Sequence, residues 1–498
     1  MKKYIFKRIL RSLFSIFMVT TLVYLAIFSL VPRNSIFKDD PAISKLKSQP
    51  DQLLEYQNSA FDRMGYLHYL NQRDFQEEVQ KDYPEFTNVE SPENQAIIEK
   101  WSKDNKEWEI GQLPISGGYF ATDDISIGAR VFNFYKNLIQ VDHPWRVKDP
   151  ENPDLKRGYQ ITHDKTVGWA LTGSGTKYYY QIYFNKKFPF IHQNIFKLNL
   201  GVSYPTFAGK PVIDVITNKQ GRPVTEEIIM PDGKSFKSAI NPYTRYYKPT
   251  SELSLTEKRM FEGSNYAGAE SNNEDPSMMM ISFRNGVTAI FLMYLIGIPM
   301  AMLMARYKGQ WVDKLGTAFI TLLISVPSVA FIFFGRFVGN KFFGLPDLFP
   351  ILGPENIKSY IMPIVVLALL SLSGTVMWIR RYMVDQQSSD YVKFARSKGL
   401  SESEISRKHI FKNAIIPIVN GIPGAIIFSI AGATITEQVF AIPGMGKMLP
   451  DAILSHNNPI AVGLIFIFSV LGVLSILLGD IAMTLVDPRI RLEVKEDK

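Results

Sequence analysis

The stretch DYVKFARSKGLSESEISRKHIFKNAIIP, residues 390–417, decides how the rest of the chain is interpreted. Its first half places Tyr391, Phe394 and Ala395 at i, i+3 and i+4, which predicts one apolar face of a short helix. Basic residues stand beside this face, and long apolar segments border the stretch on both sides. The sequence therefore predicts a short amphipathic helix held between two membrane spans.

A turn and a second helix are predicted to follow. Gly399 can adopt positive φ and end a helix, and Ser401 with Glu404 three positions later predicts a capping box that begins another. A helix-turn-helix of basic character also occurs in DNA-binding proteins. Such a domain needs a third helix and a core of its own, which the neighbouring apolar segments exclude. We therefore expect no nucleic acid as a partner.

The positive charge of this loop admits two interpretations. Arg407, Lys408 and Lys412 are explained by a solvated surface whose charge only fixes the orientation in the membrane. Ala395 and Gly399 differ, because small residues on an exposed helical turn let another surface approach the backbone closely. These two residues predict a docking site for a partner protein.

Composition separates the chain into two unlike parts. Residues 34–275 carry 29 Lys and Arg against 33 Asp and Glu, whereas the other residues carry 26 against 14. The positive excess thus belongs to the apolar part, where it concerns membrane orientation. Cysteine is absent, which excludes disulfides and cysteine-based metal or redox sites.

Six apolar segments are long enough to cross a bilayer, which takes about 17 to 25 residues in a helix. The first is too long for a signal peptide and lacks its cleavage site. The fifth contains Pro and Gly residues and is expected to bend beside a pathway. The six segments are the run that follows the basic N-terminal residues and reaches Val31, and residues 287–305, 315–338, 361–379, 414–435 and 460–486.

The positive charges between these segments predict their orientation. The N-terminus, the connections at 306–314 and 380–412, and the C-terminus hold 20 Lys and Arg, whereas the short segments on the other side hold six. This bias places both termini and the 390–417 loop in the cytoplasm, and residues 34–275 outside the cell. The domains expected are 1–33 with the first span, the extracellular domain 34–275, and the membrane core 276–498 with five spans and a cytoplasmic loop at about 384–412.

The predicted loop resembles the cytoplasmic coupling loop of ABC-importer permeases of the oligopeptide type, through YVKFARSKGL (391–400) and HIFKNAIIP (409–417). The family's Glu-Ala-Ala-x-x-x-Gly signature falls on Lys393, Phe394, Ala395 and Gly399, so only its second Ala and its Gly are kept. Further resemblances are LNLGVSYPTFAGKPVIDVI (198–216), VFAIPGMGKMLPDAI (439–453) and LVDPRIRL (485–492). They occur in the family's order, and the similarity covers about half of the chain.

The resemblance implies an all-α polytopic membrane protein with six transmembrane helices and the type I importer permease fold, carrying a large inserted α+β extracellular domain. It implies import of oligopeptides into a Gram-positive bacterium across its plasma membrane. The implied partners are a second, similar permease, two ATPases that use ATP and Mg, and an extracellular peptide-binding lipoprotein. No cofactor is expected in this chain. The residues implied in docking the ATPase are Tyr391, Phe394, Ala395, Arg396, Lys398, Gly399, Leu400 and Ser401.

Polar or small positions in the spans are the candidates for a translocation path, namely Ser325, Asn420, Ser429 and Thr434. Asp480 is the acid that lies inside an apolar segment, and a structural contact with interfacial water or Arg489 explains it as well as transport does. Gly173–Lys177 resembles part of a phosphate-binding loop, but the spacing of its glycines differs from that motif, so we interpret it as a turn. The six His show no metal-ligand spacing. The chain is not expected to be an enzyme.

A membrane-anchored sensor or adhesion protein is the alternative from another class. In it, residues 34–275 would bind a ligand and the helices would only anchor them. One helix would suffice for that purpose, so six helices with Pro and Gly breaks favour the permease.

Overall fold

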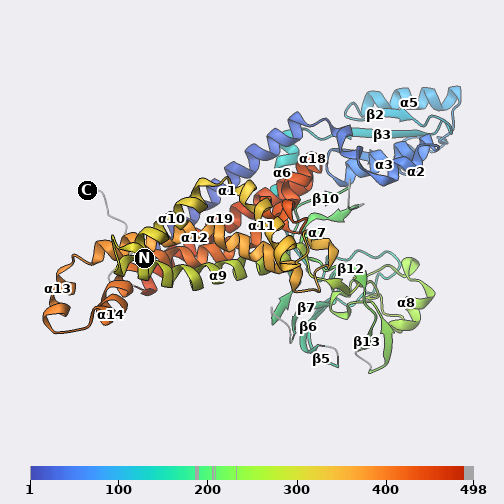
Figure 1. The fold of residues 1–498 in the computed structure, drawn as a ribbon. Helices are drawn as coiled ribbons and strands as arrows, with labels where there is room; N and C mark the ends of the chain where they lie inside the picture. Colours follow the sequence, from blue (N-terminus) through green and yellow to red (C-terminus); the bar gives the residue numbers. More distant parts are fainter. Residues whose placement is uncertain are drawn as a thin grey trace.

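A bundle of long helices forms the centre of the molecule. The computed structural model describes residues 2–165, 167–185, 190–204, 207, 209–230 and 233–486. Figure 1 shows α13 and α14 at one end of the bundle and two lobes, one above the other, at the opposite end. The loop predicted from residues 390–417 and the inserted lobes therefore lie at opposite ends of the helices, as the charge bias predicts.

Four helices of 29 residues each run through the bundle. At 1.5 Å per residue such a helix is about 43 Å long, which exceeds the roughly 30 Å hydrocarbon core of a bilayer. Within the described residues, five helices are long and apolar enough to cross, or six if a bent pair counts as one span. The four long helices are α1 (Lys2–Leu30), α9 (Met278–Arg306), α12 (Lys358–Gln386) and α19 (Asn458–Val486).

The bent pair replaces the single segment expected at residues 315–338. Helices α10 (Trp311–Ser325) and α11 (Ser328–Phe343) meet at an angle of 106°. Val326, between them, is extended because the ring of the following proline disfavours helical dihedrals in the residue before it. The apolar run is continuous in sequence, but Pro327 divides it into two helices.

The fifth span is also interrupted, as its Pro and Gly residues predict. Helix α16 (Ile416–Phe428) passes into the 3-10 turn η6 (Ser429–Ala431), and α17 (Thr434–Val439) continues after the break. Gly432 stands at the break with φ +79°, which side-chain-bearing residues rarely adopt. Outside this span, η4 (Phe349–Ile351) and α18 (Met445–Leu454) complete the loops next to the lobes.

The first lobe, residues 33–137, combines helices with one small antiparallel sheet in the order β1-β3-β2. In its core, the rings of Phe75 and Trp101 pack edge to face, with their centroids 5.3 Å apart. Its elements are η1 (Arg33–Phe37), α2 (Pro41–Leu46), α3 (Pro50–Arg63), β1 (Leu67–Leu70), α4 (Gln72–Val79), α5 (Pro92–Asp104), β2 (Glu109–Gln112), β3 (Tyr119–Asp124) and α6 (Ile127–Asn137).

The second lobe, residues 139–275, contains the antiparallel sheet β5-β6-β7-β8 and several two-stranded pairs. Gly173–Lys177 leads from one strand of that sheet into the next, so it is a turn between strands and lacks the helix of a phosphate loop. The elements are β4 (Ile139–Val141), β5 (Gly158–Asp164), β6 (Gly168–Ser174), β7 (Tyr180–Phe184), β8 (Ile191–Gln193), β9 (Phe196–Leu198), β10 (Val202–Ser203), β11 (Lys210–Pro211), α7 (Val212–Thr217), β12 (Gln220–Pro223), β13 (Glu226–Ile229), β14 (Ser235–Ser238), η2 (Pro242–Thr244), η3 (Thr250–Glu252), α8 (Leu255–Met260) and β15 (Asn273–Asp275).

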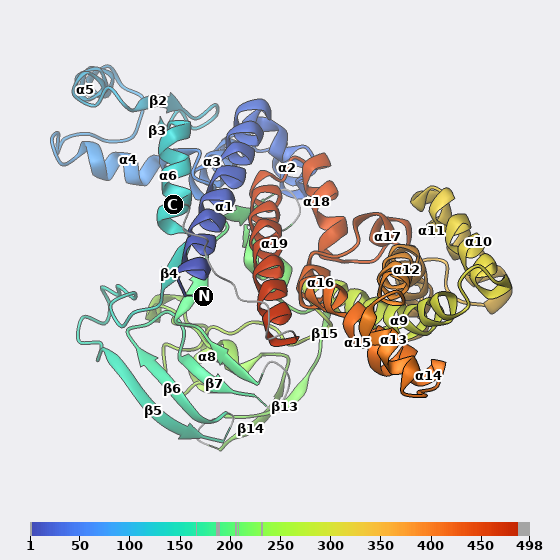
Figure 2. The same cartoon turned by 90° about the vertical axis from the view of Figure 1, so that its left-hand side faces the viewer.

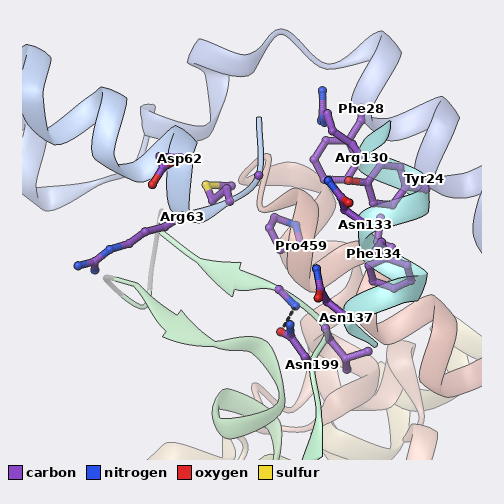
Figure 3. A pocket seen from close by; sticks show the side chains of 15 residues that line it. Tyr24, Phe28, Asp62, Arg63, Arg130, Asn133, Phe134, Asn137, Asn199 and Pro459 are labelled. Atoms are coloured by element: carbon purple, nitrogen blue, oxygen red, sulfur yellow. Dashed lines mark hydrogen bonds between the residues drawn. The ribbon is translucent and has the colours of Figure 1, made fainter. Parts of the chain in front are cut away.

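Each lobe is joined to the bundle by a different helix. In the first lobe, the guanidinium of Arg130 on α6 lies 4.6 Å from the ring of Phe28 on α1 and 4.2 Å from that of Tyr66. Figure 3 shows Arg130 beside Phe28 and Tyr24, with Pro459 of α19 across a cavity of about 180 Å³. In the second lobe, α7 packs its apolar face against α9 and α19. Figure 2 looks along the bundle from the α13 end, so the two lobes beyond its far end are seen to one side of the helices, the first lobe above the second.

An ion pair joins α10 to α12. The carboxylate of Asp313, 5% exposed, accepts hydrogen bonds from Nε and Nη2 of Arg380 at 2.6 and 2.7 Å, and from the backbone N–H of Gly309 at 2.8 Å. Because both guanidinium nitrogens bind one carboxylate, the pair fixes the relative orientation of the two helices.

Replacing Asp313 by Asn leaves Arg380 partly buried without a counter-charge. We expect Asp313→Asn to destabilise the purified protein by about 1–3 kcal/mol, because a hydrogen-bonded charge is left unpaired. Thermal unfolding in detergent measures this loss. Asp451→Asn is the matched control, since Asp451 is half exposed and 3.9 Å from Lys447. An equal effect of both substitutions would contradict a structural role for the Asp313 pair.

Candidate coupling loop and membrane cavity

The loop at the end of the bundle is built on a small apolar core. Helix α13 (Asp390–Ser397) turns Val392 and Ala395 inward, and both are buried with Ile405 and Ile410. These residues belong to the same apolar cluster as the ends of α9 and α12. The loop is therefore packed onto the membrane helices and does not hang free.

Two hydrogen bonds fix the start of the loop. Gln387 donates through Nε2 to the carbonyl of Ala305 at the end of α9, at 2.7 Å. Tyr391 donates through its hydroxyl to Oε1 of Gln386 at 2.6 Å. The first bond ties the end of α12 to α9, and the second ties α13 to the end of α12.

The predicted turn is confirmed at Gly399, which has φ +78° and nothing within 4 Å of the place where a Cβ would stand. Ser401 caps α14 (Glu402–Glu404) by accepting from the backbone N–H of Glu404. In a full capping box, the Glu404 side chain would also accept from the backbone N–H of Ser401. Here the Glu404 carboxylate instead forms an ion pair with Nζ of Lys408 at 2.7 Å.

A π-helical turn, η5 (Ile405–Phe411), then returns the chain to the bundle through α15 (Lys412–Ala414). Arg396 of α13 donates to both carboxylate oxygens of Glu402, at 2.7 and 3.2 Å. These hydrogen bonds hold the pKa of Glu402 below its ordinary value. Both side chains are largely exposed, so this pair orients the two helices more than it stabilises them.

The exposure predicted for Ala395 is wrong. Ala395 is 3% exposed, whereas Phe394 is 61% exposed with Nζ of Lys398 lying 4.5 Å from its ring. The helix is rotated from the predicted orientation because Val392 is also apolar. A face made by residues 391, 392 and 395 has helical spacing, as the predicted face of residues 391, 394 and 395 does, and it is the face that packs against the bundle. The exposed surface of the loop is instead formed by Phe394, Arg396, Lys398, Gly399 and Ser401, with Leu400 and Tyr391 half-buried.

A cavity of about 280 Å³ lies inside the bundle, between α9, α12 and the broken fifth span. Its wall is mainly apolar with a few polar groups, as in many ligand pockets. Asn285 of α9 lines it, is 2% exposed, and has no hydrogen-bond partner for either amide heteroatom within the described residues. The polar residues of the wall are Ser282, Asn285, Ser371, Ser429, Thr436 and Glu437.

Glu437, which is not among the residues predicted from the sequence, is the buried acid of this cavity. It is 2% exposed and lies inside the span Ile416–Val439. Its Oε1 accepts from the hydroxyl of Ser282 at 2.7 Å and from the N–H of Ala433 at 3.3 Å, and its Oε2 accepts from the N–H of Lys447 at 2.9 Å. One carboxylate thus joins α9, the broken span and the start of α18.

Two glycines make room for that carboxylate. A Cβ on Gly432 or on Gly444 would stand 2.4 Å from one of the Glu437 oxygens, which is closer than real atoms approach. The signal in the sequence was an acid at the end of an apolar run, followed by glycines, but Glu437 fell just beyond the segment expected at 414–435.

The four path candidates are not brought together by the fold. Ser429 lines the cavity, whereas Asn420 packs against Gly479 of α19. Ser325 donates its hydroxyl to the carbonyl of Thr321 within α10. Thr434 begins α17 and is not part of the cavity wall.

Asp480 has a structural contact, as one of its two interpretations predicts. It forms an ion pair with Arg8, which joins α19 to α1. Arg489, the other contact considered, lies outside the described residues, as does most of the motif at 485–492. No group of His, Asp and Glu that could hold a metal occurs in the described part of the chain.

Long apolar helices, a broken span beside a largely apolar cavity and a loop packed on the helix ends are the features of a polytopic membrane protein. Residues 297–492 match the family described as binding-protein-dependent transport system inner membrane component. The chain is 48% identical over 500 residues to the oligopeptide transport system permease protein AmiC of Streptococcus pneumoniae, with 100% of both chains covered. The chain therefore belongs to this permease family and has the type I importer permease fold.

Two more distant similarities accompany this result. The dipeptide transport system permease protein DppB of Lactococcus lactis is 32% identical over 212 residues, which cover 43% of this chain and 69% of DppB. A structure of the MetNI methionine ABC transporter is similar with 15% identity and a TM-score of 0.35, covering 42% of this chain and 94% of that one. As a member of the family the chain is a permease and not an enzyme, and ATP is hydrolysed by separate subunits.

The burial of Ala395 has a direct test in the stability of the loop. We expect Ala395→Arg to unfold α13 locally, because burying a charge in this apolar core costs about 3 kcal/mol or more. Trypsin cleavage of the loop in detergent should become faster. Ser397→Arg, on the exposed side of the same helix, should leave the cleavage rate close to the wild-type value after correction for the added site. Equal protection of the two variants would contradict the burial.

Proposed function

We propose that this chain is the transmembrane permease subunit of an ATP-driven oligopeptide importer, and that it docks a separate ATPase through the loop at 390–417. The observation that carries the docking is the apolar core shared by α13, η5 and the ends of α9 and α12, with Phe394 exposed beside it. A motion imposed on this loop is transmitted to the helices, because a packed core does not deform gradually.

The substrate class comes from the full-length similarity to a protein named as an oligopeptide transport permease. The cavity between α9, α12 and the broken span forms part of this chain's half of the path. The amide of Asn285 offers one donor and one acceptor group there, which is the complement of a peptide bond. Of the residues expected to form the path, Ser429 is retained, and Asn285, Ser371 and Thr436 are added.

The partners follow from the family. A second permease supplies the other half of the path, two ATPases bind ATP and Mg, and a lipoprotein delivers the peptide. This chain binds no cofactor of its own. A sensor or adhesion protein is the weaker alternative, because a relative matched over its whole length is a transport permease.

Phe394 is the sharpest test of docking. We expect Phe394→Ala to lower peptide-stimulated ATP hydrolysis of the assembled importer about tenfold or more, since exposed aromatic residues dominate interface energies. The thermal unfolding temperature should stay unchanged, because the ring is exposed. Ile115→Ala removes an equally exposed apolar side chain from the first lobe and serves as the control. Full activity of the Phe394 variant would refute docking through this loop.

The orientation has an independent test that uses the absence of native cysteine. We propose that both termini and α13 lie in the cytoplasm of a Gram-positive cell and that the two lobes lie outside. A cysteine at Ser397 should react with a membrane-impermeant maleimide only after the cells are permeabilised. A cysteine at Asp154 of the second lobe should react in intact cells. The opposite pattern would reverse the assignment of sides.

A further inference from the structure

The four-stranded sheet of the second lobe, β5-β6-β7-β8, carries apolar side chains on its outward face. An antiparallel sheet with one face in water normally has the opposite arrangement, with its polar residues outward. Here the buried face is the one that holds polar groups. Thr172 is buried there, and Tyr180 donates its hydroxyl to the carboxylate of Asp164 at 2.7 Å. The outward face of this sheet is therefore not built to face water.

The strand register gathers six apolar residues on the outward face. Ile161 of β5 pairs with Leu171 of β6, which pairs with Ile182 of β7. Within the described residues of the four strands, no Asp, Glu, Lys or Arg lies on this face. A contiguous apolar patch of this kind marks contact with a protein or a membrane. The apolar face consists of Ile161, Trp169, Leu171, Ile182, Phe184 and Ile191, of which the first, second, fifth and sixth are exposed.

The two ribbon views show which way the apolar face is turned. In Figure 1, β5, β6 and β7 lie on the side of the second lobe nearer the α13 end, and α8 lies on its far side. In Figure 2, seen from the α13 end, the same strands stand in front of α8, and no membrane helix crosses in front of β5 and β6. The buried face packs on Tyr179 and Tyr243 in the interior of the lobe. The apolar face is therefore turned back along the bundle, toward the membrane.

Contacts of α6 place the start of the second lobe beside the membrane helices. The ring of Phe134 lies 6.4 Å from that of Phe466 of α19, and the hydroxyl of Tyr135 donates to the carbonyl of Phe17 of α1 at 3.0 Å. Phe466 is eight positions from the start of α19, or about 12 Å at 1.5 Å per residue. Strand β4 begins at Ile139, directly after α6. The chain thus enters the second lobe beside the outer part of these spans.

Exposed apolar side chains connect α6 with the sheet. Phe132 of α6, Ile139 and Val141 of β4, and Phe196 of β9 are all exposed. Val141 pairs with Phe196, and β9 follows β8 after two residues. The apolar surface of the lobe is therefore continuous with α1 and α19, two of the helices that are long and apolar enough to cross a bilayer.

We propose that the apolar face lies in the outer leaflet of the bilayer, at the level where the acyl chains meet the head groups. The inference rests on the proposed orientation only for the choice of leaflet. Lipid suits this face because aliphatic side chains leave water there without burying a charge. The indole of Trp169 is favoured at this boundary, where its N–H stays hydrated.

Lipid quenching of a fluorophore on the apolar face tests this contact. The full-length Ile161→Cys protein, labelled with nitrobenzoxadiazole, is placed in nanodiscs of phosphatidylglycerol and phosphatidylcholine. Lipid with a doxyl group near the head-group end of its acyl chain should quench this label several-fold more strongly than a label on Leu255→Cys. Aqueous iodide should quench the two labels in the reverse order. Leu255 of α8 is the matched control, because both side chains are apolar and 76% exposed and α8 lies on the far side of the same lobe.

A charge placed in the apolar face gives a second measurement. Trp169→Asp should lower the doxyl quenching of the Ile161→Cys label several-fold, because a carboxylate resists transfer from water into lipid. Leu255→Asp should leave that quenching unchanged. Unchanged quenching in the Trp169 variant would overturn the proposal, as would equal doxyl quenching of the Ile161 and Leu255 labels.

The importer assembled with its second permease separates lipid from a protein partner. Protection of the Ile161 label from iodide that appears only in this assembly, without doxyl quenching, assigns the face to a protein contact and overturns the proposal. Peptide-stimulated ATP hydrolysis of the same assembly distinguishes the two proposals. Hydrolysis with an iodide-accessible label rejects the lipid contact alone, whereas a lipid-quenched label without hydrolysis supports the contact and rejects the importer.

Discussion

The apolar contact between α9 and α12 holds the α13 end of the molecule together, because it continues beyond the ends of these helices. Ala301, Ile379 and Met383 belong to the same buried cluster as Val392 and Ala395 of α13. Such a cluster has the density of an organic solid and few voids, so its parts move together. The loop is thus an extension of two spans, whereas a solvated connection would move independently of them.

Around the central cavity, a polar contact holds neighbouring segments together. The carboxylate of Glu437 binds groups on α9, at the break of the fifth span and before α18. Leaving a buried carboxyl group without hydrogen-bond partners is costly, so these hydrogen bonds hold the three segments together. Gly432 and Gly444 have no side chain, so the backbone can approach this carboxylate closely at both places.

The sequence predicts those features that depend on the length of an apolar segment or on the backbone dihedrals of single residues. The apolar segments, the turn at Gly399 and the interruption of the fifth span follow from residue type alone. The burial of Ala395, the 106° bend at Val326 and the setting of Glu437 depend on which surface meets which neighbour, and periodicity cannot decide that. The cavity joins residues more than a hundred positions apart, from Ser282 to Ile442, so no local sequence pattern marks it.

The sharp corner between α10 and α11 constrains what can surround the protein. At such a corner the last carbonyl groups of α10 lack the amide partners that a continuing helix would supply, and Pro327 has no N–H to offer. Hydrocarbon offers no hydrogen bonds, so it cannot cover these groups. Ile324 and Val329 beside the corner are exposed in the single chain. The corner therefore belongs at the depth of the lipid head groups or against a neighbouring subunit, and annular lipid tails are excluded from it.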